Sequence, residues 1–176
     1  MRVLRFLGWL SVVIALAICV VMVMGSRVPV QHTVTDAEII PASQQRVWNL
    51  ITDVPAQANW RTGLKAVHPL PSQNGATCWA GVQGGMTMPL CADVREAPVR
   101  QVVRIADPKL PFGGTWTYVL EPVGESATKV TITENGTTGP AMWRFVDHYI
   151  LHEDAEIKQY MGDLKRAASE GVPNGR

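Results

Sequence analysis

The chain has 176 residues, of which 47% are hydrophobic and 18% are charged. This length suits one domain with an appendage, and the hydrophobic content is ample for a core. The net charge is +1 and no run of like charges occurs, which argues against a nucleic-acid partner.

The N-terminal segment is predicted to be a membrane-spanning helix. Residues 6–24 carry no charged side chain. At ~1.5 Å per residue they extend roughly 28 Å, which matches the hydrocarbon core of a bilayer. Arg2 and Arg5 precede this segment, whereas only Arg27 follows it closely. The positive-inside rule therefore predicts a cytoplasmic N-terminus and an extracytoplasmic (periplasmic) domain.

A cleaved signal peptide is the alternative interpretation of this segment. Signal peptides have an apolar region of about 7 to 15 residues, followed by small residues at the cleavage site. Here the apolar stretch is longer, and the residues after it offer no Ala-x-Ala pattern. We therefore expect a transmembrane signal-anchor over residues 1–28, one domain over residues 29–170 and a disordered tail over residues 171–176.

After the anchor, a strand and two short helices are expected. Within residues 31–40, β-branched side chains alternate with other residues, and Pro41 follows directly. This pattern predicts a strand. A helix is predicted from about Ser43, because the apolar residues that follow recur at helical spacing until Pro55 closes it. A second short helix extends to Trp60.

The central part of the chain predicts an antiparallel meander. Turn residues separate six short strands, over residues 64–70, 76–83, 86–96, 99–106, 114–121 and 128–135. Gly84-Gly85 suits a two-residue hairpin turn. Pairing outward from this turn sets residue 83 opposite residue 86 and Cys78 opposite Cys91. A disulfide fits that pair, and two buried thiols on one sheet face are the alternative.

The C-terminal part predicts one long helix that lies across the sheet. It begins at Pro140 and extends to about Ser169. One apolar stripe follows this helix and needs a sheet to cover: Met142, Phe145, Val146, Tyr149, Ile157, Tyr160, Met161 and Leu164. The predicted fold class is therefore α+β, with an antiparallel sheet wrapped on a long C-terminal helix and one transmembrane helix before it.

Several short motifs resemble a known superfamily. Residues 40–48 are similar to its opening "I-x-A-s-x-x-x-V-W", and residues 52–60 to the following "t-D-f-x-x-y-x-x-W". Residues 112–118 and 131–136 look like the last two strands of a bacterial subgroup, and residues 157–164 fit its terminal helix. In this order they resemble the START-like or SRPBCC superfamily, which has the helix-grip fold and includes polyketide cyclase/dehydrase-like proteins.

The resemblance implies a cavity between the sheet and the C-terminal helix. Such cavities accept lipids, quinones, polyketides or other apolar molecules. The resemblance implies no particular reaction, because catalytic and non-catalytic members share the fold. The residues expected to line the cavity, from their strand parity or their place on the helical stripe, are Trp116, Tyr118, Val130, Ile132, Glu134, Phe145 and Tyr149.

Glu134 and His152 are the candidate acid/base residues. Glu134 continues a row of strand positions that is otherwise apolar, so inside a cavity it could bind the polar end of a ligand or act as a base. A solvated position at the strand end is the alternative. His152 lies near the helical stripe and could contact a ligand, with a solvated helix flank as the alternative.

No metal or cofactor is expected. His148 and His152 have the i, i+4 spacing that can bring two imidazoles to one metal. The third ligand is missing, because Glu156 stands where an H-E-x-x-H motif needs histidine.

These observations predict a membrane-tethered binding module for a hydrophobic small molecule such as a lipid, a quinone or a polyketide-like compound. Its expected partners are that molecule and the membrane. The first alternative is a cyclase or dehydratase-like enzyme that uses Glu134 or His152 as acid/base. The second is an interaction module of a membrane complex, with a vestigial cavity filled by side chains.

Overall fold

A computed structural model describes residues 2–151 and 154–170 of the chain. The predicted tail lies outside the described residues, as does His152. In chain order, the structure contains α1 (Arg2–Arg27), β1 (Gln31–Ile40), α2 (Gln44–Thr52), the 3₁₀ helix η1 (Pro55–Asn59), β2 (Leu64–Gln73), β3 (Ala76–Gln83), β4 (Met86–Glu96), β5 (Arg100–Ile105), β6 (Phe112–Val123), β7 (Ala127–Thr138), α3 (Ala141–Val146), the π-helical turn η2 (Asp147–Leu151) and α4 (Ala155–Glu170).

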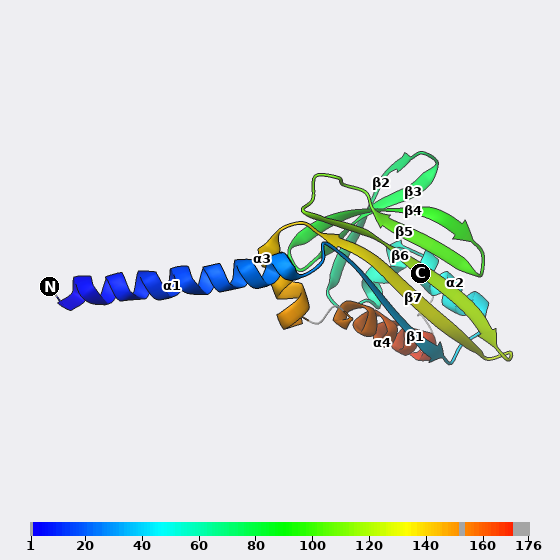
Figure 1. Cartoon of the computed structure of the whole chain (residues 1–176). Helices are drawn as coiled ribbons and strands as arrows, with labels where there is room; N and C mark the ends of the chain where they lie inside the picture. The colour runs from blue at the N-terminus through cyan, green and yellow to red at the C-terminus, as the bar shows by residue number, and fades with distance from the viewer. Residues whose placement is uncertain (1, 152–153, 171–176) are drawn as a thin grey trace.

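One seven-stranded antiparallel sheet forms the body of the domain. Its strand order is β1-β7-β6-β5-β4-β3-β2, so strands β2 to β7 form a meander and β1 pairs with the last strand. The sheet curves around α2 and α4, which lie on its inner face, whereas α1 projects away from the domain (Figure 1). The core lies between sheet and helices, and its most buried side chains include Ile40, Leu120, Ile132, Met161 and Leu164.

The local pattern of the sheet agrees with the sequence. Strands β3 and β4 have the predicted bounds, and Gln83 pairs with Met86 across the Gly84-Gly85 turn. Both glycines have positive φ, which L side chains rarely adopt. Cys78 pairs with Cys91, their Cα atoms lie 4.1 Å apart, and a disulfide joins their sulfur atoms. The last two strands are longer than predicted and continue to residues 123 and 138.

The prediction of one continuous C-terminal helix is wrong. Two separate helices, α3 and α4, occupy most of this region, and η2 directly follows α3. They cover different surfaces: Ile157 and Leu164 of α4 are buried against the sheet, whereas α3 packs on the carboxyl end of α1. Helical spacing shows that a face is apolar but not which surface it covers, so the two apolar faces read as one stripe.

The N-terminal helix α1 is a candidate membrane span over Gly8–Arg27, by length and composition. Nearly all its apolar side chains point away from the protein. Its carboxyl end is fixed to the domain, because Arg144 of α3 donates a hydrogen bond from Nε to the carbonyl of Gly25, 3.0 Å away. An arginine there also compensates the negative end of the helix dipole and a carbonyl that has no partner within α1.

Candidate functional site

A cavity of about 310 Å³ lies between the sheet and α4. Strands β3 to β7 form its walls, and α2, η1 and α4 close it from the other side. Its lining is mainly apolar and aromatic, as in most small-molecule sites. The lining side chains that the following description uses are Gln57, Arg61, Trp79, Met86, Gln101, Trp116, Tyr118, Ile132, Glu156 and Tyr160.

Gln101 is a polar side chain inside this apolar cavity. It lies on β5 opposite Tyr118 of β6, and strand parity directs it to the same face as the buried Val103. Gln101 is 1% exposed, and its Oε1 atom has no hydrogen-bond partner among the described residues. A buried carbonyl without a partner costs roughly 1–3 kcal/mol. A bound group that donates a hydrogen bond to Oε1 would remove this cost.

Two tyrosines meet at the base of the cavity. The rings of Tyr118 and Tyr160 lie 5.6 Å apart. Burial raises the pKa of Tyr118 to about 12, although the Arg61 guanidinium partly opposes it. Burial also raises the pKa of Tyr160 well above 10.0, and the neighbouring Tyr118 raises it further. Both phenols are therefore neutral at physiological pH and can donate a hydrogen bond. A contact between the two hydroxyls contributes to both pKa shifts, but the buried Tyr160 hydroxyl has no hydrogen bond of good geometry within the described parts of the chain.

Arg61 contributes a positive charge at the edge of the cavity. Its guanidinium lies over the Tyr160 ring, 4.9 Å from the centroid, in cation–π geometry. A hydrogen bond of 3.1 Å to Gln57 Oε1 fixes this arginine, and Gln57 in turn donates to the carbonyl of Ile51. The charge of Arg61 is thus held next to the two phenols.

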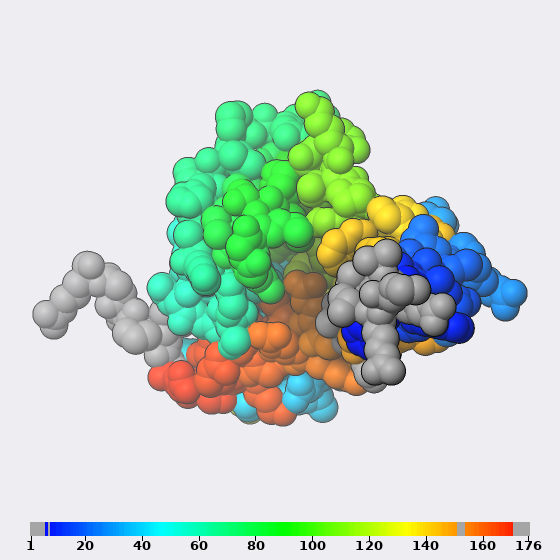
Figure 2. Space-filling view, turned by 90° about the vertical axis from the view of Figure 1, so that its left-hand side faces the viewer, coloured from blue at the N-terminus to red at the C-terminus, as the bar shows by residue number. Residues whose placement is uncertain are grey.

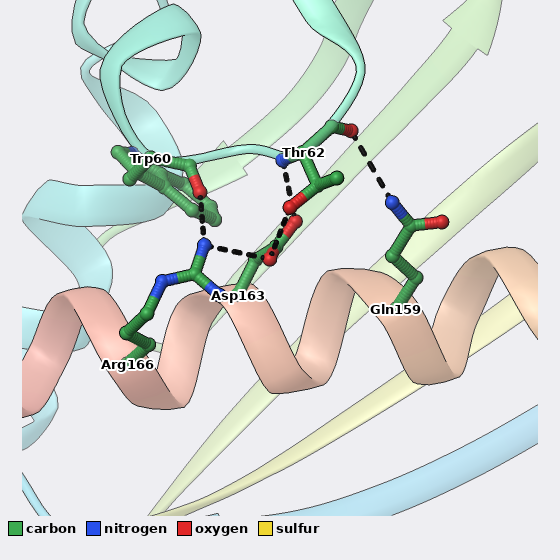
Figure 3. A network of polar contacts seen from close by, with 5 residues as sticks. All are labelled: Trp60, Thr62, Gln159, Asp163 and Arg166. Carbon is green, nitrogen blue, oxygen red and sulfur yellow. Dashed lines mark hydrogen bonds and ion pairs between the residues drawn. The ribbon is translucent and has the colours of Figure 1, made fainter.

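A polar network on α4 holds the segment that carries Arg61 (Figure 3). Asp163 accepts hydrogen bonds from the backbone N–H and the hydroxyl of Thr62, at 2.6 and 2.8 Å. Arg166 bridges Asp163 and the Trp60 carbonyl, at 2.8 and 3.0 Å. Burial alone would raise the pKa of Asp163, but these hydrogen bonds and the Arg166 charge outweigh it, so the pKa is lowered.

Glu134 lies behind the wall of the cavity rather than in its lining. The indole Nε1 of Trp116 donates a hydrogen bond to Glu134 Oε2 at 3.0 Å. His32 Nε2 lies 3.6 Å from the other carboxylate oxygen. The His32 ring fits because it crosses Gly136, where any Cβ atom would lie about 2.2 Å from Nε2. Burial is the largest influence on Glu134 and raises its pKa. The hydrogen bond from Trp116 lowers the pKa, the nearby Glu156 raises it and His32 lowers it. The net result is a raised pKa.

The structure brings together only part of the predicted cavity set. Trp116, Tyr118 and Ile132 line the cavity. Val130 shares their face but is fully buried in the core beyond it, and Glu134 reaches the cavity only through Trp116.

Phe145 and Tyr149 do not line the cavity, which corrects the prediction for these two residues. They lie on α3 and η2, where their rings contact each other in a tilted arrangement, 5.1 Å between centroids, and Phe145 lies next to Gly25 of α1. This error follows from the single long helix that the sequence predicted. No group of three metal-ligating side chains occurs within the described residues.

Several residues of the site escaped the sequence analysis. Gln101 could have been found from strand parity, because it lies in the same inward-facing row of β5 as the apolar Val103. Arg61 and Asp163 give no local signal, because their roles depend on a contact between segments about a hundred residues apart.

A curved antiparallel sheet around a C-terminal helix, with a cavity between them, defines a START-like domain of the helix-grip class. A family model described as "Polyketide cyclase / dehydrase and lipid transport" matches residues 31–168, so the chain belongs to this family. No curated protein sequence matches the chain significantly.

Solved structures with low sequence identity share the fold. A START superfamily protein from Mycobacterium smegmatis has a TM-score of 0.62 at 11% identity, over 79% of this chain and 98% of that protein. A truncated norcoclaurine synthase from Thalictrum flavum has a TM-score of 0.64 at 11% identity, over 81% and 96%. An aromatase/cyclase from Streptomyces sp. R1128 has a TM-score of 0.59 at 14% identity, over 81% and 99%. At these identities the likeness concerns the fold alone.

Proposed function

We propose that this protein binds one hydrophobic small molecule with a polar end, and that α1 tethers the binding domain to a membrane. The observation that carries the proposal is the unpartnered Gln101 Oε1 atom, which is buried in a largely apolar cavity that the Tyr118 and Tyr160 side chains also line. Natural proteins rarely leave buried polar atoms unpaired, and a site for a ligand is one reason to do so. The family membership supports the same class of function.

The lining favours a ligand that carries a hydroxyl or another hydrogen-bond donor. Gln101 Oε1 can only accept, whereas the neutral phenols of Tyr118 and Tyr160 can donate or accept. Trp79 and Trp116 offer flat aromatic surface for a ring or an isoprenoid chain. Quinols, phenolic polyketides and lipids with a free hydroxyl combine these properties. The volume of about 310 Å³ is at the lower end for ligand sites.

Anchoring and orientation are part of this proposal. If α1 spans the membrane with Arg2 and Arg5 in the cytoplasm, the domain lies outside it, next to the layer in which apolar molecules partition. The tether raises the local concentration of such a ligand without any new contact.

The experiment is extraction of bound molecules from the full chain, purified in mild detergent, followed by mass spectrometry. We expect one apolar species in near-stoichiometric amount with the wild type. Gln101→Leu keeps the size of the side chain but removes the acceptor, and we expect it to lose most of that species. Gln45→Leu, the same change at an exposed position of α2, is the matched control. Equal retention by both variants would contradict the role of Gln101, and an empty wild type would contradict binding.

The alternative of an enzyme depends on Glu134, whose raised pKa would suit an acid/base role. The carboxylate is already engaged by Trp116 and His32, and it lies behind the wall, so binding is the better-supported function. Glu134→Gln separates the two, because only the enzyme requires a residue there that exchanges a proton. A vestigial cavity filled by side chains is not supported by the volume observed.

A further inference from the structure

The segment 141–151, formed by α3 and η2, exposes an unusual amount of apolar surface. Met142, Trp143, Tyr149 and Ile150 are 48%, 54%, 48% and 58% exposed. The first two lie on α3 and the last two on the π-helical turn that directly follows it, so four large exposed apolar side chains are concentrated within nine residues. We call this surface the α3–η2 face. At the far end of the sheet, exposed apolar residues lie on different elements, such as Val99 between β4 and β5 and Val123 at the end of β6.

The position of the α3–η2 face is fixed by α1. Gly25 approaches α3 so closely that a Cβ atom there would lie 1.9 Å from the Ala141 carbonyl oxygen. The Arg144 side chain joins the Gly25 carbonyl to the carbonyls of Thr138 and Gly139, at the end of β7. Gly25 lies within one turn of the end of the candidate span. If α1 spans the bilayer, the α3–η2 face therefore lies at its surface.

The composition of this face matches the interfacial layer of a membrane. Tryptophan and tyrosine prefer the headgroup level, where the ring is buried and the polar atom stays hydrated. Short amphipathic segments with large apolar residues on one side lie in that layer. Arg27 at the end of α1 suits the headgroup region as well.

The mouth of the cavity lies on the same side of the domain. Gln83, Gly84 and Met86, at and beside the β3–β4 turn, and Glu156 in the first turn of α4 line the cavity on this side. Figure 2 views the side from which α1 projects, and it shows a recess between the green β3–β4 segment and the orange helices. Met86 on this side is 46% exposed.

We propose that the α3–η2 face is a second membrane contact, which inserts into the headgroup layer and holds the mouth of the cavity against the bilayer. The occupant of the face is the lipid bilayer itself. The ligand then passes between bilayer and cavity without crossing bulk water. This inference rests on the proposed anchoring by α1, but on no particular ligand.

The test uses the full chain with Cys19→Ala, reconstituted in vesicles of phosphatidylcholine and phosphatidylglycerol. An environment-sensitive nitrobenzoxadiazole label is placed at Trp143→Cys or, separately, at Ile150→Cys. Val123→Cys, at an exposed apolar position at the end of β6, is the matched control. The disulfide stays oxidised during labelling. We expect lipids spin-labelled near the headgroup to quench the label several-fold more strongly at positions 143 and 150 than at position 123, and iodide to show the opposite order.

Three other outcomes overturn the inference, and they differ in what else they affect. If spin-labelled lipids quench positions 143 and 150 no more than the control, and iodide reaches both freely, the membrane contact is refuted but the anchor is not. Protection from both quenchers shows that a second copy or another protein covers the face instead. Loss of the protein from the vesicles in alkaline carbonate refutes the anchoring and, with it, this inference. Two labelled positions guard against a defect in one variant.

Discussion

Asp163 shows how one side chain can position a binding site that it does not touch. Its carboxylate joins α4 to Thr62 and, through Arg166, to the Trp60 carbonyl. Between these two residues lies Arg61, which covers the Tyr160 ring. The position of the Arg61 charge next to the two tyrosines therefore depends on the Asp163 carboxylate of α4.

For Asp163→Asn we expect a loss of about 2–3 kcal/mol in the free energy of unfolding at pH 7, because the charge-assisted hydrogen bonds weaken or reverse. The measurement is urea unfolding in mild detergent, followed by tryptophan fluorescence. Asp93→Asn is the control; it removes a half-exposed ion pair with Arg104, and we expect less than about 1 kcal/mol.

The effect of Asp163 has a defined pH dependence. Its folded pKa lies below the ordinary value of 3.8, so its contribution is present above that pH and is lost as the pH falls through the folded pKa. The difference between wild type and Asp163→Asn should shrink in this acid range. A difference that stays constant into strong acid would contradict the role of the charge.

For Glu134 we expect the opposite pH dependence of the free energy of unfolding. Burial raises its folded pKa above 4.5, so its contribution is full below that pH and is lost as the pH rises through the folded pKa. The titratable groups that face it are Glu156 and His32. Glu134→Gln keeps an acceptor for Trp116 but cannot ionise, so its unfolding free energy should decline less than that of the wild type as the pH rises from about 4.5.

Glu121→Gln is the control for this measurement, because Glu121 is exposed on β6 and paired with Lys129. Unfolding is measured at intervals of pH for the three proteins. Parallel profiles for the wild type and Glu134→Gln would show that the buried carboxylate does not control the stability in this range.

At the scale of elements, strands were easier to predict than helices. A period of two and turn residues such as Gly84-Gly85 are local signals, and they gave the β3–β4 hairpin with its register. The apolar stripe from Met142 to Leu164 correctly indicated helix in α3 and α4, but it missed the π-helical turn η2, and the two helices meet different surfaces. Only the fold decides which surface a helix covers, and for α3 that surface is another helix far away in the sequence.

The same reasoning explains what was predicted of the site. Trp116, Tyr118 and Ile132 were found because parity places them on the inner face of two adjacent strands. Arg61 and Asp163 were missed because a polar residue near a turn or on a helix normally faces water. Phe145 and Tyr149 were assigned to the cavity because their helix was assumed to continue across the sheet.

The junction of α1 and α3 gives a prediction at this scale. For Gly25→Ala we expect α3 to separate from α1, because the new Cβ atom meets a backbone oxygen that cannot rotate away. Hydrogen–deuterium exchange over residues 141–151 should become faster. Gly8→Ala is the control in the same helix, since nothing lies within 4 Å of a Cβ atom there. Equal exchange in both variants would show that the close approach does not hold α3.

At the scale of the whole molecule, if α1 spans a membrane as proposed, its direction decides which compartment the cavity serves. The arginines before and after the span predict an extracytoplasmic domain. The Cys78–Cys91 disulfide is an independent indicator, because such bonds persist in oxidising compartments and are rare where glutathione and thioredoxin act. Both residues are nearly fully buried on β3 and β4, so the bond belongs to the folded domain.

Alkylation of the two cysteines tests this direction. In membranes that carry the full chain with Cys19→Ala, denatured without reductant, we expect Cys78 and Cys91 to resist a maleimide of high mass. After reduction, both should react and retard the protein on a gel. Cys78→Ser leaves Cys91 single and provides the positive control, because it should react without reductant. Free reaction of both cysteines in unreduced protein would place the domain in a reducing compartment, and its ligand would then come from the cytoplasmic leaflet instead.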